Sequence, residues 1–130
     1  MTEKEKMTAG KIYDPSDEEL VKLRTKAHRL SKEYNELLET DEKRSEILKE
    51  MGIIGDSFYL QGPVQFDYGC LTSIGANSYA NFNFTCVDCC PVTIGANVFM
   101  GPKCVTSYPD ASAPLAGSQP ISETEWNTYR

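Results

Sequence analysis

The stretch YANFNFTCVDCCPVTIGANVFMGP, residues 79–102, decides the fold of this chain. It contains Ile-Gly-Ala-Asn at 94–97, and the same four residues stand at 74–77. Small or apolar residues recur every six positions around the two copies, at Ile74, Ala80, Cys86, Ile94, Met100 and Thr106. An aliphatic residue followed by glycine on a six-residue period is typical of a β-solenoid built from hexapeptide repeats. Each hexad is expected to form one short strand and a turn, and three hexads form one coil.

The second copy of Ile-Gly-Ala-Asn begins two positions later than three hexads after the first copy would place it. Two extra residues are therefore expected near Cys89, Cys90 and Pro91, where they would bulge from one corner of the solenoid. The repeats predict a parallel β-helix over residues 53–106. Each copy of Ile-Gly-Ala-Asn would then occupy the same corner on successive coils, with its isoleucine facing the core.

The N-terminal part has a different composition. Residues 1–51 carry 11 of the 13 lysines and arginines and 13 of the 19 acidic residues, and the rest of the chain is nearly uncharged. A net charge of −6 argues against nucleic acid or an anionic membrane surface as a partner. The N-terminus lacks the apolar run of a signal peptide, no stretch approaches membrane-spanning length, and the five cysteines are an odd number. These features favour a reduced, cytoplasmic protein.

Two helices are indicated in the charged segment. Ser16 and Glu19 have the spacing of a capping box, which predicts the start of the first helix. An apolar stripe follows at spacings of three and four, as on a helix of roughly six turns. Its members are Leu20, Leu23, Ala27, Leu30, Tyr34 and Leu37. A second helix is expected after Thr40 and ends at Gly52, so residues 1–52 are predicted to form a helical hairpin.

Histidine and cysteine chemistry is not indicated. His28, the only histidine, lies beside the apolar stripe, and nothing nearby in the sequence supplies the partner and cleft that a catalytic histidine needs. We interpret it as an exposed or half-buried helix residue. Cys86, Cys89 and Cys90 suggest a metal, but zinc needs four ligands and no second cysteine pair or histidine has a suitable spacing. They are interpreted as small residues at tight corners, and no metal site is predicted.

These segments resemble the maltose and galactoside O-acetyltransferases, which are hexapeptide-repeat acyltransferases. The matching pieces are TEKEKMTAGKIYDPSDEEL, the helical stripe, FDYGCLTSIGANSYANFNFTCVD and CPVTIGANVFMGP. The resemblance implies a left-handed parallel β-helix, assembled as a homotrimer, with the helical hairpin packed against it. It also implies transfer of an acetyl group from acetyl-CoA to a sugar hydroxyl. In this family a histidine acts as the general base at the interface between neighbouring subunits.

The resemblance also implies the residues that bind the acceptor sugar. Asp67 in Phe-Asp-Tyr-Gly and Asn81 in Tyr-Ala-Asn-Phe-Asn match acceptor-binding positions, and Asp14 or Asp17 matches a third. Cys89 stands where the family usually has aspartate, which removes one acceptor ligand. Without the family context, Asn81 has the alternative interpretation of a structural ladder residue at a coil corner.

The family's catalytic histidine has no counterpart here, because its position falls near Ala111. Asp110 is a poor substitute for a base that titrates near neutral pH. The later coils, which bind acetyl-CoA in the family, are also missing, so we expect a truncated β-helix of about two coils with an uncapped end. Residues 107–130 have the composition of an irregular tail. The chain is therefore expected to be inactive by itself.

A shifted reading frame accounts for both the missing histidine and the tail. If the codons of residues 110–114 are read one base later, Thr-His-Pro-Leu is one permitted translation. The codons of residues 125–128 then give asparagine or serine followed by an obligatory glycine, which is a second family landmark. Our hypothesis is a one-base slip, a splicing difference or a gene-model error near Cys104.

Three functions remain open at this stage. The chain represents a cytoplasmic sugar O-acetyltransferase lineage, or it is a non-catalytic module that binds sugar or enters trimers, or it is a relic product. Acetyl transfer by the purified chain would favour the first. Entry into trimers without acetyl transfer would favour the second, and an insoluble or rapidly degraded chain the third.

Overall fold

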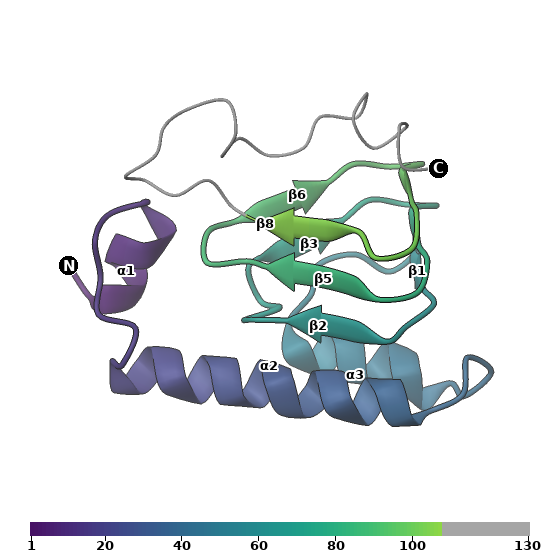
Figure 1. Ribbon diagram of the computed structural model, residues 1–130, viewed down its shortest axis with the longest axis horizontal. Helices are drawn as coiled ribbons and strands as arrows, with labels where there is room; N and C mark the ends of the chain where they lie inside the picture. Colours follow the sequence, from purple (N-terminus) through teal and green to yellow (C-terminus); the bar gives the residue numbers. More distant parts are fainter. Residues whose placement is uncertain (108–130) are drawn as a thin grey trace.

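The computed structural model of the chain describes residues 1–107 (Figure 1). The helices are α1 (Glu3–Thr8), α2 (Glu18–Glu36) and α3 (Lys43–Met51). The strands are β1 (Tyr59–Leu60), β2 (Val64–Phe66), β3 (Thr72–Ile74), β4 (Tyr79–Ala80), β5 (Phe84–Val87), β6 (Val92–Ile94), β7 (Phe99–Met100) and β8 (Val105–Ser107). Residues 108–130, which include Ala111 and nearly all of the predicted tail, lie outside this description.

The predicted helical hairpin is confirmed, since α2 and α3 pack against each other. Stripe residues Leu20, Ala27, Leu30 and Tyr34 are buried on one face of α2. Helix α3 ends at Gly52, whose φ of 98° is left-handed and favours glycine. None of the helices in residues 1–107 is both long and apolar enough to cross a membrane.

The predicted capping box is wrong. Helix α2 has Asp17 as its N-cap residue, and no side chain caps it. Ser16 instead donates its hydroxyl to Asp14 Oδ1 at 2.6 Å, and the Ser16 backbone N–H donates to the same oxygen at 2.9 Å. This local turn around the aspartate competes with the cap and takes the serine that the motif requires. The short helix α1 was not predicted.

The solenoid is confirmed as three parallel sheets stacked around one core (Figure 1). The sheet orders are β1-β4-β7, β2-β5-β8 and β3-β6, and every strand pair is parallel. Each strand pairs with the third strand after it along the chain, as in Tyr59 with Tyr79 and Thr72 with Val92. The interval between paired residues is the same in every pair of strands, so the coil length is constant from β1 to β8, and only the isolated bridge of Ile54 with Ser73 is one residue shorter.

The six-residue period marks the core, as predicted. Side chains at equivalent positions stack from coil to coil, in columns such as Leu60–Ala80–Met100, Phe66–Cys86–Thr106 and Ile74–Ile94. All of these residues are buried. Phe66 and Phe84 meet edge to face, with their ring centroids 5.8 Å apart.

The two copies of Ile-Gly-Ala-Asn form the narrow corner, residues 75–78 and 95–98, between β3 and β4 and between β6 and β7. Asn77 and Asn97 have φ of 63° and 59°, a left-handed conformation that asparagine tolerates better than most residues. A Cβ atom on Gly75 would lie 2.4 Å from the backbone nitrogen of Ala96. The asparagine repeats because each coil needs the same left-handed turn, and the close approach of the two coils explains the glycine at 75.

The extra residues form the wide corner, residues 67–71 and 88–91, between β2 and β3 and between β5 and β6. The bulge predicted at Cys89, Cys90 and Pro91 is confirmed. An equivalent extension at 67–71 was not predicted, because no repeated motif marks it. The two extensions stack, which keeps the coil length constant.

The helical hairpin covers the open edge of the first coil, and Figure 1 shows α2 lying along β2. Asn35 takes the place of a neighbouring strand, because its Nδ2 donates to Val64 O at 2.9 Å and its Oδ1 accepts from Val64 N at 2.7 Å. Tyr34 and Arg44 both donate to Leu60 O, Arg44 at 2.8 Å. The exposed strand edge that a solenoid otherwise presents at its end is thereby satisfied.

Candidate functional site

The candidate site lies at the wide corner, on the side of the solenoid next to α1 (Figure 1). Met7, Leu20 and Tyr68 form a buried cluster there, separate from the main core. The thiol of Cys90 donates to Met7 O at 3.0 Å, which ties α1 to the corner. Segments far apart in the sequence therefore converge on the wide corner.

Asp67 pairs with His28 at this corner. The distance from Asp67 Oδ1 to His28 Nε2 is 3.2 Å, and the two side chains are 32% and 54% exposed. His28 is an exposed residue of α2, as the sequence predicts, but it also has a partner, which comes from a strand end 39 residues away in the sequence. An imidazole and a carboxylate, both open to solvent, are available to bind a polar ligand.

Arg24, one helical turn before His28, holds the neighbouring aromatic residue. One of its nitrogens donates to the Tyr68 hydroxyl at 2.9 Å, and another donates to Pro15 O at 2.9 Å. Burial raises the pKa of Tyr68, and its hydrogen bond raises the pKa of Arg24. The guanidinium thus stays charged beside a neutral phenol, and it links α2, the wide corner and the segment that precedes α2.

Cys89 and Tyr13 meet through a side-chain hydrogen bond. Burial raises the pKa of the Cys89 thiol, and burial together with this bond raises the pKa of Tyr13 to about 12. Both groups are therefore neutral at pH 7. Position 89, where the family resemblance leads us to expect an aspartate, therefore has an uncharged thiol in this chain.

The other predicted acceptor residues lie at varying distances from this cluster. Asp14 is exposed, adjoins Tyr13, and directs its Oδ1 to Ser16. Asp17 is partly buried at the N-terminus of α2.

Asn81 lies elsewhere. It follows β4 at a third corner of the solenoid, and its Oδ1 accepts from Phe82 N at 2.8 Å. The chain thus brings Asp67 and Cys89 to one corner and leaves Asn81 at another. The position of the missing base near Ala111 falls outside the described residues.

Sequence reasoning missed Arg24, His28, Tyr68 and Tyr13. One signal was present, since Arg24 and His28 are four residues apart and therefore share a helix face next to the apolar stripe. What that face would meet depends on how α2 lies across the first coil, which the sequence does not specify.

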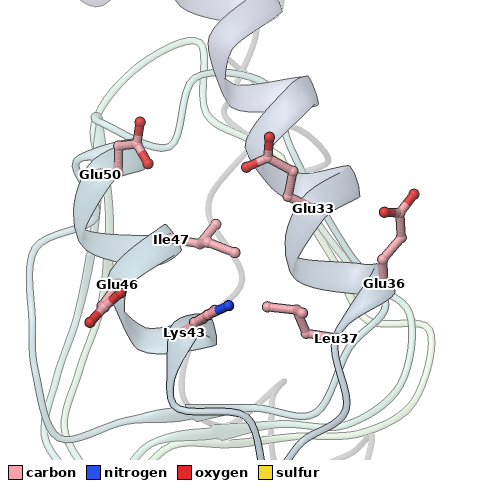
Figure 2. Close-up of a pocket in the computed structure, with 7 residues that line it drawn as sticks. All are labelled: Glu33, Glu36, Leu37, Lys43, Glu46, Ile47 and Glu50. Atoms are coloured by element: carbon pink, nitrogen blue, oxygen red, sulfur yellow. The ribbon is translucent and has the colours of Figure 1, made fainter.

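A groove with a volume of about 370 Å³ lies between α2 and α3, away from the wide corner (Figure 2). Leu37 and Ile47 point into it from the two helices. The remaining lining residues are Glu33, Glu36, Lys43, Glu46 and Glu50. Four carboxylates against one ammonium give this groove a negative potential, which opposes binding of a phosphate-bearing molecule such as acetyl-CoA.

The wide corner suits a polyhydroxylated ligand. Asp67 accepts hydrogen bonds, Arg24 donates them, and Tyr13 and Cys89 are neutral groups that do either. Within residues 1–107, no group of three or more histidine, cysteine, aspartate or glutamate side chains is arranged to hold a metal ion.

Comparison with known proteins gives a consistent family. Residues 6–51 match the family model described as the maltose acetyltransferase hexapeptide capping motif. The galactoside O-acetyltransferase of Escherichia coli is 39% identical over 81% of this chain and 54% of its own length. The crystal structure of a maltose O-acetyltransferase from Clostridium difficile superposes with a TM-score of 0.76, at 35% identity over 99% of this chain and 66% of that one.

A hexapeptide-repeat acetyltransferase from Vibrio cholerae, solved in complex with acetyl-CoA, superposes with a TM-score of 0.71, at 34% identity over 83% of this chain and 58% of that one. The chain spans 54% to 66% of the length of these three relatives. The matched capping motif coincides with the hairpin that covers the first coil, and the matched solenoid carries the wide corner. The chain belongs to the maltose and galactoside O-acetyltransferase family of hexapeptide-repeat proteins.

Proposed function

We propose that this chain supplies the acceptor-binding half of an acetyl-CoA-dependent sugar O-acetyltransferase. The observation that carries the proposal is the convergence of Asp67, His28, Arg24 and Tyr13 at the wide corner. Hydroxyl groups of a sugar both donate and accept hydrogen bonds, and this cluster offers both kinds of partner to one ligand. Acetyl-CoA is the proposed donor because a family relative of similar fold binds it.

The chain by itself is proposed to bind sugar without acetylating it. Acetyl transfer needs a base within hydrogen-bond reach of the acceptor hydroxyl. His28 lies in the cluster, but its Nε2 already faces Asp67. The resemblance assigns the base to a position near Ala111, where this chain has no histidine. We further propose that the solenoid is a left-handed β-helix, and that the protein works in the cytoplasm without nucleic acid or membrane as a partner.

A homotrimer is proposed as the functional assembly. The outward face of β1-β4-β7 carries Tyr59, Tyr79 and Phe99 in one ladder, and the rings of Tyr59 and Tyr79 stack with centroids 5.6 Å apart. Tyr59 and Phe99 are 38% and 46% exposed, which is unusual for aromatic side chains and favours contact with another chain. In a trimer, Asn81 of one subunit would complete the acceptor site of its neighbour.

The aromatic ladder also favours the second candidate function, a non-catalytic module that assembles with related chains. The two functions differ in sugar binding. The acceptor-binding function needs the wide corner, whereas an assembly module needs only the aromatic ladder. Sedimentation of the intact chain and of Tyr79→Lys tests the trimer directly. We expect the intact chain to sediment as a trimer and Tyr79→Lys as a monomer, and a monomeric intact chain would contradict the assembly.

The decisive experiment uses the single histidine signal in the NMR spectrum of the intact chain. We expect maltose or methyl galactoside to move the His28 imidazole signal of the chain, and not that of Asp67→Asn, and mass spectrometry to find no acetylated sugar after incubation with acetyl-CoA. Acetylated sugar would show that the chain is active by itself. An unmoved signal with both sugars would contradict the acceptor site.

A further inference from the structure

Asp88 carries a carboxylate that the proposed function does not use. Its side chain is fully buried, and it lies at the wide corner, directly before Cys89. Oδ1 accepts a hydrogen bond from Tyr68 N at 2.8 Å, and Oδ2 accepts one from the Thr72 hydroxyl at 2.8 Å. The Gly69 backbone N–H also bonds to it. Burial outweighs these bonds and raises the pKa of Asp88.

These bonds cross from one coil to the previous one. Asp88 belongs to the second coil, whereas its three partners Tyr68, Gly69 and Thr72 belong to the first. A buried carboxylate is costly, and a corner that needed only bulk would be filled by an apolar residue. The carboxylate supplies two oxygens that bind two backbone donors from the irregular segment 67–71 and one hydroxyl donor from the first residue of β3.

The segment that Asp88 holds is the one that presents the site. Asp67 and Tyr68 are adjacent, and they reach His28 and Arg24 respectively on α2. A shift of the Tyr68 backbone would therefore change both contacts together, and Cys89 would move with Asp88 itself.

We propose that Asp88 is a positioning residue of the acceptor site, which fixes the Tyr68 backbone so that Asp67 reaches His28 and the Tyr68 hydroxyl reaches Arg24. The part that concerns sugar rests on the proposed function, whereas the part that concerns the Asp67–His28 contact does not. Asp88 acts through these neighbours, and its own atoms are closed to a ligand.

Asp88→Asn is the main test variant. The amide oxygen still accepts one hydrogen bond, but the amide nitrogen only donates, so at least one of the three donors loses its partner. Asp56→Asn is the matched control, because it makes the same chemical change at an exposed residue outside the wide corner. Asp67→Asn is the reference variant, because it gives the position of the His28 NMR signal in a chain without the Asp67 carboxylate.

The first readout is the NMR signal of the His28 imidazole, measured with far-UV circular dichroism to verify folding. We expect Asp88→Asn to move the signal toward its position in Asp67→Asn, and Asp56→Asn to leave it in place. A folded Asp88→Asn whose His28 signal matches that of the intact chain, while Asp67→Asn moves it, would overturn the proposal. If Asp88→Asn does not fold, the same readout is measured for Thr72→Val, which removes the hydroxyl that binds Asp88. Thr72→Ser keeps this hydroxyl and is the control for Thr72→Val.

The second readout is maltose affinity. We expect Asp88→Asn to weaken the Kd roughly tenfold, the effect of losing one hydrogen bond to a charged group. Unchanged affinity in a variant whose His28 signal has moved would overturn the link to the acceptor site. If the intact chain binds no sugar, the proposed function fails, and the His28 readout still decides whether Asp88 positions Asp67.

Discussion

The narrow and wide corners of the same solenoid are built in different ways. The narrow corner, 75–78 and 95–98, repeats four residues and turns through left-handed asparagines and a glycine at the close approach, and the hydroxyl of Ser78 links its two copies. The wide corner, 67–71 and 88–91, repeats nothing and is held by side chains from other segments, such as Asp88 from the next coil. Asp67, His28 and Arg24, the polar residues of the candidate site, lie at the wide corner or face it.

The difference separates scaffold from site. Every coil makes the turn at the narrow corner, and the residues Ile-Gly-Ala-Asn specify its conformation. The same four residues therefore recur in each copy. A corner with two extra residues leaves the regular ladder, and it then needs specific partners to be rigid. Those partners bring charged and aromatic side chains together at the wide corner, where they can contact one ligand. The following predictions test this division, beginning with the narrow corner.

The largest effect is expected for Gly75→Ala. The added Cβ would lie 2.4 Å from Ala96 N and 2.5 Å from the carbonyl carbon of Gly95, and these backbone atoms cannot move without separating the two coils. We expect the free energy of unfolding to fall by about 3 kcal/mol or more. Guanidinium denaturation followed by circular dichroism measures it.

Gly95→Ala is the matched control, because its added Cβ would have as its nearest neighbour in the described residues Val98 Cγ2 at 3.9 Å. Its effect should stay within about 0.5 kcal/mol. If the two variants lost the same free energy of unfolding, the close approach between the coils would not be the reason for the glycine at 75.

The wide corner should respond to Gly69→Ala in a different way. Gly69 has a φ of 73°, and the added Cβ would lie 2.3 Å from Met51 Cγ, which is a flexible side chain and not backbone. We expect a loss of about 2 kcal/mol from backbone strain and displacement of Met51. In the Met51→Ala background the same substitution should cost about 1 kcal/mol less, measured as a double-mutant cycle. Additive effects would mean that Met51 does not brace the corner.

A smaller effect is expected from the titration of Asp88. Burial raises its pKa in the folded state above the ordinary value of 3.8, so the folded state binds this proton more tightly than the unfolded state. The stability that Asp88 contributes is therefore full below pH 3.8 and is lost as the pH rises through the folded-state pKa.

Urea denaturation of the intact chain and of Asp88→Asn between about pH 3.5 and about 7 measures this effect, since the other carboxylates titrate in both proteins. The free energy of unfolding of the intact chain should fall relative to that of the variant as the pH rises, and then stay level. A relative rise would mean that hydrogen bonds to the carboxylate outweigh its burial.

The sequence predicts the narrow corner and the core well, for a physical reason. Ile74 and Ile94 mark the same position in two coils, and the glycine and asparagine beside them serve one turn, so the cause of each residue lies within a few positions of it. The helical stripe was predictable on the same ground, from Leu20 to Tyr34. The capping box at Ser16 failed because Asp14, two residues away, competed for the same hydroxyl.

The candidate site was only partly predictable. Asp67 and Cys89 were expected through a family resemblance, whereas their partners His28 and Tyr13 lie far away in the sequence. The partners depend on the angle at which α2 crosses the first coil, and that angle is set by contacts such as Asn35 with Val64. No local pattern encodes such a contact.

The smallest effect, at the narrow corner, tests whether the turn at Asn77 depends on the backbone conformation of the asparagine or on its side chain. Asn77 is exposed and has a φ of 63°, so Asn77→Ala should cost about 1 kcal/mol through the left-handed conformation. Asn77→Gly should be neutral within a few tenths of a kcal/mol, because glycine adopts this φ freely. At the adjacent Ala76, whose φ is not positive, glycine should instead cost roughly 0.5–1 kcal/mol by loosening the unfolded chain. If Asn77→Gly were as harmful as Asn77→Ala, the asparagine side chain itself would hold the turn, and the narrow corner would resemble the wide one.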